Sequence, residues 1–301
     1  MRLAYHLLDV FTDVALAGNP LAVVSDADGV SAERMQAIAR EFNLSETVFL
    51  LDPRNKLHSA RLRIFTPTHE LPFAGHPTVG AACLIAFLRA PEMLGRQPLH
   101  IVLEEEIGIV ACDVSRFRGA LRASFNAPQT PVLGAVLEDF KGVAGALGAG
   151  VDEIGFDDHR PVIASAGLPF AFVPVKSLAA LNRLAPKPAF FRDVFALEWP
   201  AVFVYTRETL DPQHHVHARF FGPGLGVAED PATGSAACAF AAVATAFEKP
   251  EDGEHIIVIE QGFAMGRPSL ITLTMDVAGG RLAQAGIGGA SVIVGEGFLN
   301  L

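Results

Sequence analysis

Two halves of this 301-residue chain carry the same motifs in the same order, and this repeat is the feature that most limits the possible folds. R-I-F-T-P occurs at 63–67 and R-F-F-G-P at 219–223, while A-A-C occurs at 81–83 and again at 236–238. Both pairs are separated by about 155 residues. A repeat of this length indicates a duplicated domain, because solenoid repeats are much shorter.

Each half runs from a strand through a proline turn, an acidic residue and a glycine-containing loop into an alanine-rich apolar helix. Short apolar or alternating segments bounded by turn residues predict strands throughout both halves. They lie at 5–11, 21–24, 47–51, 62–65, 101–105, 107–112 and 121–125, and at 162–164, 170–175, 201–205, 216–221, 256–260, 270–275 and 292–295.

The segment at 126–134, N-A-P-Q-T-P-V-L-G, has the proline-rich composition of a linker. A chain of this length accommodates two domains. We therefore predict an α+β fold with two pseudo-symmetric domains, 1–127 and 128–301, each a mostly strand-built layer around one apolar helix. The last strand, near 292–301, is the part that could instead return to the first domain.

Two kinds of helix are expected. Ser31 can cap a surface helix in which Met35, Ile38 and Phe42 fall on one face. The run at 81–88 is apolar on nearly every side, so it belongs inside a core. The N-terminus of such a helix carries unpaired N–H groups and a partial positive charge, which suit a carboxylate.

Composition excludes several classes of function. The formal net charge is −10 and no Lys/Arg cluster occurs, which argues against nucleic-acid and anionic-membrane partners. The longest apolar runs stop at Arg89 and Glu248, too short to span a bilayer. Asp9 and Asp13 interrupt any signal-peptide core, and three widely spaced cysteines suggest a reducing compartment. We expect a soluble cytoplasmic protein.

Polar residues cluster where the two apolar helices begin. His76 precedes the first helix, in E-L-P-F-A-G-H-P-T-V-G at 70–80, and Asp230 and Ser235 flank the second, in E-D-P-A-T-G-S-A at 229–236. A structural histidine and two helix-capping side chains are the alternative interpretation. Glu46, in N-L-S-E-T-V-F at 43–49, is either a partly buried acid suited to proton transfer or an exposed glutamate at a strand start.

Other chemistries have less support. The run H-H-V-H at 214–217 places His215 and His217 on one face of a strand, but no third metal ligand has a recognisable spacing, so we predict no metal site. No P-loop, G-x-G-x-x-G or G-x-S-x-G motif occurs. Cys83 and Cys238 lie within the apolar runs and are expected to be small buried residues.

Several of these motifs, with two more, match one known family in the same order. They are A-G-N-P-L-A-V-V at 17–24, N-L-S-E-T-V-F at 43–49, F-T-P-T-H-E-L-P-F-A-G-H-P-T at 65–78, E-D-P-A-T-G-S-A at 229–236 and Q-G-F-A-M-G-R-P-S at 261–269. The chain resembles the phenazine-biosynthesis isomerase-like (PhzF-like) family, nearly end to end. The resemblance implies the diaminopimelate epimerase-like fold: two domains, each a barrel-like, mostly antiparallel sheet around a central helix, with the active site between them.

The resemblance also implies roles for individual residues. Glu46 stands where the family has its general acid/base. His76, Asp230 and Ser235 stand where the family binds substrate and assists proton movement. Gly75 and Gly234 would supply backbone donors at the two helix starts, and Asn19 is a further substrate-binding candidate. The resemblance also suggests a homodimer.

Related racemases and epimerases place one cysteine at each helix start. Aligning the loops puts Ala74 and Ala232 at those positions here. Alanine carries no proton, so stereoinversion by two thiols is disfavoured. A single acid/base can still remove a proton and return it elsewhere on the same substrate.

The leading hypothesis is a cofactor-independent isomerase of a small carboxylate-bearing metabolite, with Glu46 moving the proton. The alternatives are a racemase or epimerase that uses Glu46 and another non-thiol base, and a catalytically silent protein that binds a small ligand. The motifs do not identify the substrate.

Overall fold

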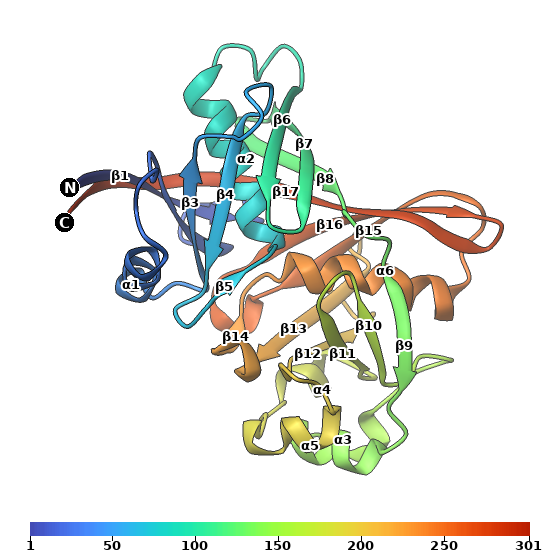
Figure 1. Cartoon of the computed structure of the whole chain (residues 1–301). Coiled ribbons are helices and arrows are strands. Elements are labelled where there is room, and N and C mark those ends of the chain that lie inside the picture. Colours follow the sequence, from blue (N-terminus) through green and yellow to red (C-terminus); the bar gives the residue numbers. More distant parts are fainter. The chain divides into compact units, whose positions relative to one another are not determined.

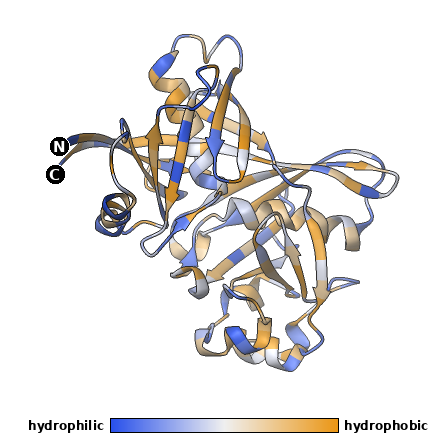
Figure 2. Cartoon of the chain, in the orientation of Figure 1, coloured by the Kyte–Doolittle hydropathy of each residue, from blue (hydrophilic) through white to orange (hydrophobic).

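A computed structural model describes all 301 residues, and they form two compact units (Figure 1). Unit 1 comprises Met1–Pro128 together with Ile287–Leu301, and unit 2 comprises Gln129–Gly286. Hydrophobic residues lie along the strands and also in helices, whereas hydrophilic residues gather in the turns and on α1 (Figure 2). None of the helices has the length and hydropathy needed to cross a bilayer.

Unit 1 is a closed ring of strands. The ring follows the order β1–β2–β3–β4–β6–β7–β8–β17 and returns to β1, with parallel pairing only at β2–β3 and β4–β6 among the ladders from β1 to β8. A short strand, β5, pairs with β4. Their bounds are β1 Arg2–Val10, β2 Asn19–Val24, β3 Glu46–Leu51, β4 Ala60–Phe65, β5 Glu70–Leu71, β6 Leu99–Glu105, β7 Gly108–Phe117, β8 Ala120–Asn126 and β17 Arg281–Asn300.

Helix α2 (Gly75–Arg89) lies inside this ring and contacts β1, β2, β3, β6, β7 and β8. Every residue from Gly75 to Ala86 is buried, as an all-round apolar helix requires. Gly80 allows the close packing, because a Cβ there would lie 2.6 Å from Leu21 Cδ2 and 2.8 Å from Val10 Cγ2. The helix begins at Gly75, six residues before the apolar run predicted from the sequence.

The predicted surface helix is α1 (Ala32–Phe42), and its N-cap is confirmed. The Ser31 hydroxyl accepts the N–H of Arg34, and Asn43 ends the helix in the left-handed conformation with φ of 51°. Met35, Ile38 and Ala39 face β3 and β4 in a cluster with Phe49 and Phe65.

Unit 2 repeats the strand pairings of unit 1. The strands β11 and β12 are parallel, as β2 and β3 are, and β13–β15 is parallel, as β4–β6 is. The bounds are β9 Val132–Val136, β10 Val162–Ser165, β11 Pro169–Pro174, β12 Val202–Thr206, β13 Val216–Gly222, β14 Val227–Asp230, β15 Gly253–Gln261 and β16 Ser269–Ala278. Helix α6 (Gly234–Glu248) packs on β9, β10, β11 and β16, and Gly234 and the residues from Ala236 to Ala244 are buried.

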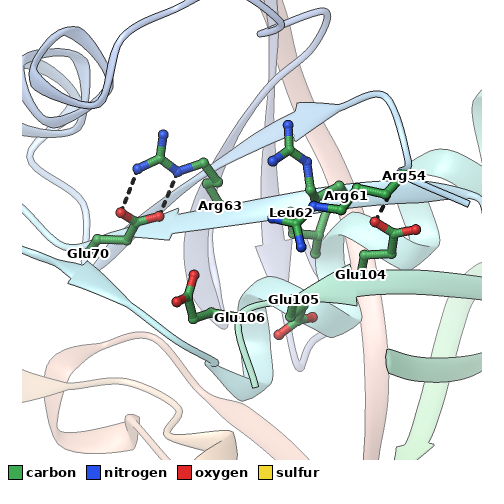
Figure 3. A pocket seen from close by; sticks show the side chains of 8 residues that line it. All are labelled: Arg54, Arg61, Leu62, Arg63, Glu70, Glu104, Glu105 and Glu106. Atoms are coloured by element: carbon green, nitrogen blue, oxygen red, sulfur yellow. Dashed lines mark hydrogen bonds and ion pairs between the residues drawn. The ribbon is translucent and has the colours of Figure 1, made fainter. Parts of the chain in front are cut away.

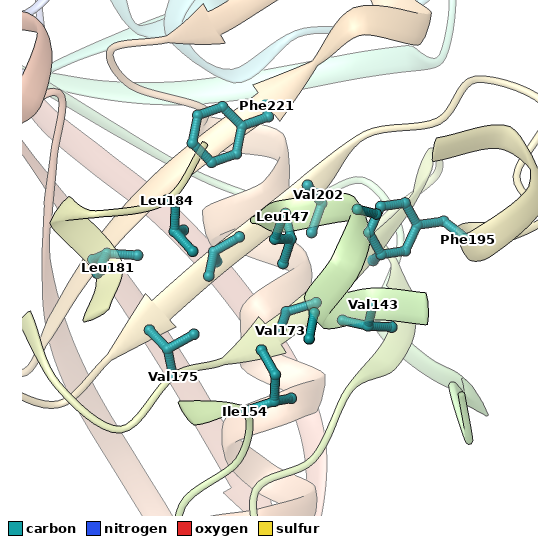
Figure 4. Close-up of a cluster of buried hydrophobic side chains, with 14 of the residues drawn as sticks. Val143, Leu147, Ile154, Val173, Val175, Leu181, Leu184, Phe195, Val202 and Phe221 are labelled. Atoms are coloured by element: carbon teal, nitrogen blue, oxygen red, sulfur yellow. The ribbon is translucent and has the colours of Figure 1, made fainter. Parts of the chain in front are cut away.

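A second core in unit 2 lies under three short helices (Figure 4). They are α3 (Phe140–Leu147), α4 (Leu178–Asn182) and α5 (Phe191–Phe195), which cover strands β11 and β12. Four 3₁₀ turns complete the chain at Val151–Glu153, Pro188–Phe190, Pro223–Leu225 and Phe263–Met265.

The α+β prediction with duplicated barrel-like halves is confirmed, but two details of the sequence comparison were wrong. The matching A-A-C segments are not equivalent, because Cys83 is the ninth residue of α2 and Cys238 the fifth of α6, one helical turn apart. His215 precedes β13, so it does not share a strand face with His217.

Candidate active site

Glu46 and His76 meet at one end of unit 1. Glu46 begins β3, where it pairs with Leu21, and His76 is the second residue of α2. The distance from His76 Nε2 to Glu46 Oε2 is 3.4 Å, and the two side chains are 4% and 15% exposed. The local sequence left Glu46 open between a buried acid and an exposed one; it is largely buried.

Asn19 lies on the other side of the histidine ring. It begins β2, is fully buried, and its Nδ2 lies 3.3 Å from His76 Nδ1. With the amide nitrogen toward Nδ1, that ring nitrogen accepts, so the single proton of neutral imidazole resides on Nε2, facing Glu46. Burial lowers the pKa of His76 to about 3, which keeps the ring neutral.

The start of α2 leaves backbone donors beside this group. The N-cap Ala74 has no capping side chain, and the first helical hydrogen bond is Thr78 N–H to Ala74 O at 3.3 Å. The N–H groups of Gly75 and His76 therefore have no partner within the helix, and Pro77 has no N–H. These groups and the helix dipole favour an anion at this end.

In unit 2, Asp230 is held at the start of α6. It ends β14 and is 7% exposed. Its Oδ2 accepts the hydroxyl of Thr233 at 2.6 Å, and Thr233 is the N-cap of α6.

Gln261, at the end of β15, connects these two residues. Its Nε2 donates to Asp230 O at 2.8 Å and to Thr233 Oγ1 at 3.1 Å, while its Oε1 accepts the Thr233 N–H at 3.1 Å. Gln261 is fully buried. The orientation of every donor in this network is consistent, so it fixes the Asp230 carboxylate relative to the helix start.

Gly234 and Ser235 are the first two residues of α6, as Gly75 and His76 are of α2. Gly234 is buried and Ser235 is half-buried. The helical ladder starts at Ala237 N–H to Thr233 O, 2.9 Å, so the preceding N–H groups have no partner within the helix. Each unit therefore presents one polar helix start: Glu46, His76 and Asn19 with Gly75 in unit 1, and Asp230 and Ser235 with Gly234 in unit 2.

Comparison with known proteins gives the family. A sequence model of the phenazine biosynthesis-like proteins (PhzC-PhzF) matches residues 8–297. The chain belongs to this family. An uncharacterized isomerase of Mesorhizobium japonicum is 47% identical, with 98% of each chain covered. The trans-2,3-dihydro-3-hydroxyanthranilate isomerase of Pseudomonas chlororaphis is 35% identical, with 99% of each chain covered.

Solved structures agree with this assignment. The crystal structure of a Bacillus anthracis phenazine biosynthesis protein of the PhzF family has a TM-score of 0.89 and 28% identity, and the match covers both chains completely. The predicted family and fold are confirmed, and so is the prediction of an isomerase.

Within this PhzF-like chain, the positions expected to correspond to the thiols need one correction. The residue directly before Gly75 is Ala74, and the residue directly before Gly234 is Thr233. The helix starts therefore align Ala74 with Thr233, whereas the comparison of the loop sequences aligned Ala74 with Ala232. Neither residue is a cysteine, so the argument against a thiol pair is unchanged.

Sequence reasoning missed the residues that fix the two helix starts, Gln261 and Thr233 in unit 2 and Thr78 and Glu105 in unit 1. The Thr78 hydroxyl lies 2.8 Å from Ala74 O and 2.7 Å from Glu105 Oε1. The repeat contained the signal, because Glu105 and Gln261 both end the strand that pairs in parallel with the Arg-containing strand of their half.

Two histidines of the 214–217 run contact one buried carboxylate, that of Glu260. His214 Nδ1 lies 2.7 Å from Glu260 Oε1, and His217 Nδ1 lies 2.6 Å from Glu260 Oε2. The same carboxylate accepts the N–H groups of Leu210 and Asp211. These contacts secure the loop before β13.

Proposed function

We propose that this protein is a cofactor-independent isomerase of a small carboxylate-bearing metabolite, in which Glu46 moves a proton from one substrate carbon to another. The observation that carries the proposal is the Glu46–His76–Asn19 chain of contacts at the start of a buried helix. The C–H bond breaks as a Glu46 oxygen takes the proton, the double bond shifts, and the same carboxyl returns the proton to another carbon. Substrate and product have the same formula.

The surroundings of Glu46 favour this role. The Nε2 of neutral His76 lies 3.4 Å from Glu46 Oε2, and a ring N–H at this position favours the carboxylate form of Glu46, which is the form that accepts a proton. Because burial lowers the pKa of His76 to about 3, the ring stays neutral and does not compete with Glu46 for the substrate proton. Asn19 fixes the tautomer from the other side.

The two helix starts suit the substrate's charge. The N–H groups at Gly75 and Gly234 have no partner within their helices, and such groups bind carboxylates. We propose that Asp230 and Ser235 also bind substrate, as hydrogen-bonding or proton-relay groups.

A single base is favoured because neither helix start carries a thiol. Ala74 has no exchangeable side-chain proton, and the Thr233 hydroxyl is committed to Asp230 at 2.6 Å. Proton shift along a conjugated system needs one acid/base, whereas inversion needs a second group on the opposite face.

Proton–deuterium exchange tests this function. We would incubate the protein in D₂O with trans-2,3-dihydro-3-hydroxyanthranilate, the compound in the relatives' name, and with a panel of small carboxylic acids. Exchange at carbon with formation of an isomer is expected for the correct chemotype. Glu46→Gln should lower its rate by about 10²–10⁴-fold. Glu41→Gln, on the exposed side of α1, is the matched control and should leave the rate unchanged.

A second candidate is an epimerase in which Asp230 is the other base. The buried position of this carboxylate at the second helix start favours it. Deuterium incorporated with inversion of one stereocentre, lost in both Glu46→Gln and Asp230→Asn, would select this candidate. Saturable binding of a ligand with no exchange would instead indicate a silent binding protein. A homodimer stays a prediction, which sedimentation velocity would test.

A further inference from the structure

A charged hollow lies in unit 1 (Figure 3). Its volume is about 320 Å³, and its lining consists of Arg54, Arg61, Leu62, Arg63, Glu70, Glu104, Glu105 and Glu106. Arg61 pairs with Leu51, five residues along β3 from Glu46, which is about 16 Å at roughly 3.3 Å per residue.

Most of the acidic lining is already engaged. Glu70 receives a bidentate pair from Arg63, at 2.7 and 2.6 Å. Glu104 accepts the N–H groups of Arg54 and Asn55 and contacts His58 Nδ1 at 2.8 Å.

The Glu105 side chain contacts the Thr78 hydroxyl of α2 at 2.7 Å, inside the ring. Glu106 is exposed and is the remaining carboxylate of the hollow, with no ion pair within 4.0 Å.

The two other arginines, Arg54 and Arg61, form no ion pair. Neither guanidinium has a carboxylate within 4.0 Å, and Arg61 Nε is buried without a hydrogen-bond partner. A buried donor without a partner is costly, so a ligand that supplies an acceptor is favoured. Figure 3 shows hydrogen bonds for Arg63 but none from the Arg61 side chain.

Unit 2 contains the equivalent pair of residues, and there the two side chains are in contact. His217 pairs with Glu260 in the β13–β15 ladder, as Arg61 pairs with Glu104 in the β4–β6 ladder. His217 Nδ1 contacts its carboxylate at 2.6 Å, whereas the Arg61 side chain makes no such contact.

The second arginine also differs between the halves. In unit 1, Glu104 accepts the backbone N–H of Arg54, and in unit 2 the equivalent Glu260 accepts the backbone N–H of Leu210. Leu210 therefore occupies the position of Arg54. Both positions that are cationic in unit 1 therefore lack a permanent positive charge in unit 2.

We propose that the Arg54–Arg61 hollow of unit 1 binds a small ligand bearing a phosphate group. Planar guanidinium groups match phosphate oxygens in paired hydrogen bonds, and two guanidinium groups without an ion-pair partner favour a dianion over a carboxylate. Arg63 is occupied by Glu70 and closes one side of the hollow. This site is independent of the isomerase function proposed for Glu46.

Calorimetric titration with inorganic phosphate at low ionic strength tests the proposal. Saturable binding is expected for the wild type, and Arg61→Gln should raise the dissociation constant at least about tenfold. Arg61→Lys keeps the charge but loses the planar fork, so an intermediate loss is expected. A phosphomonoester, β-glycerophosphate, serves as a second probe: tighter binding than phosphate would identify an organic phosphate as the ligand, and equal binding would identify free phosphate.

Arg192→Gln, an exposed arginine in unit 2, is the matched control for loss of one charge and should bind phosphate as the wild type does. Circular dichroism of each variant establishes that it folds. The proposal is overturned if the wild type shows no saturable phosphate binding, or if Arg61→Gln and Arg192→Gln bind with the affinity of the wild type.

Discussion

Glu104 and Glu105 are adjacent in β6 but have opposite protonation behaviour. Glu104 accepts two backbone N–H groups, which together with His58 lower its pKa from 4.5 to about 2. Burial raises the pKa of Glu105 to about 8, against a smaller lowering by its bond with Thr78. The single Thr78 hydroxyl proton lies between Ala74 O and Glu105, so a protonated Glu105 supplies the second proton that this cluster needs.

The raised pKa of Glu105 predicts a pH-dependent stability. Between pH 4.5 and about 8 the folded state holds a proton that the unfolded chain has released, so the free energy of unfolding falls as pH rises. The slope from this group is about 1.4 kcal/mol per pH unit, and it ends above pH 8. Glu105→Gln cannot ionise and should lack this slope in urea titrations, becoming more stable than the wild type at pH 9.

Glu104→Gln is the internal control, because its effect has the opposite sign. The lowered pKa of Glu104 contributes stability that is fully present above pH 4.5 and is lost as pH falls toward 2. This variant should therefore be less stable than the wild type at pH 7 and should approach it in acid. Parallel curves for Glu105→Gln and the wild type from pH 5 to 8 would contradict the assignment of a buried proton to Glu105.

At this scale, sequence reasoning reached the residues with local signals. Glu46 and His76 stand out because a charged or titratable residue interrupts an apolar context. Gln261 and Glu105 do not, since their roles depend on hydrogen bonds to a helix start far away in the chain. Only the equivalence of the two halves connects them.

At the scale of single elements, a helix was predictable from the sequence where all of its signals lie within one segment. The α1 helix was predictable because its cap and its apolar face lie within one segment. The first turn of α2 was not, because Gly75, His76 and Pro77 are poor helix formers in isolation. They are helical here because the surrounding strands bury them.

The turn from β15 to the 3₁₀ segment Phe263–Met265 supports the start of α6, and it predicts a strongly disruptive substitution. Gly262 has φ of 78°, and a Cβ there would lie 2.4 Å from Arg267 O and 2.6 Å from Pro231 O. Both neighbours are backbone atoms, so Gly262→Ala must displace Pro231, next to Asp230. We expect a loss of about 1–3 kcal/mol or more in the free energy of unfolding.

Gly266→Ala separates the strain of the backbone angle from the clash. Gly266 also has a positive φ, 68°, but no atom lies within 4 Å of its would-be Cβ. It should lower the free energy of unfolding by about 1 kcal/mol, the ordinary penalty for a left-handed alanine. Equal losses in the two variants, measured by urea unfolding, would show that the close contact of the new Cβ with Pro231 adds nothing to the loss of stability.

For the whole molecule, duplication is what the sequence predicted best. The Arg-containing strands β4 and β13 carry equivalent bidentate pairs, Arg63 with Glu70 and Arg219 with Glu229. What the sequence left open was the last strand, because a hydrophobic alternation specifies a strand but not its neighbours. Residues 287–300 of β17 pair with β1 and β8 and close the ring of unit 1.

Because the end of β17 closes the ring of unit 1, we expect its removal to disrupt unit 1 and to leave unit 2 folded. A chain ending at Gly286 loses the strand between β1 and β8, along with the buried side chains of Ile287, Ala290 and Ser291. Two unpaired strand edges should remain beside α2, so unit 1 should lose its cooperative structure. Hydrogen exchange should show protection lost in β1, β2 and β8, while strands β10–β13 of unit 2 keep theirs.

A peptide spanning residues 287–301, added in trans, supplies the missing strand and should restore protection in β1 and β8. A peptide of the same composition in scrambled order should not, because the alternation that faces α2 would be lost. Protection of β1 that persists in the truncated chain without peptide would mean that the remaining strands close on α2 by themselves. Restoration by the native peptide alone would establish that unit 1 depends on a strand encoded after the whole of unit 2.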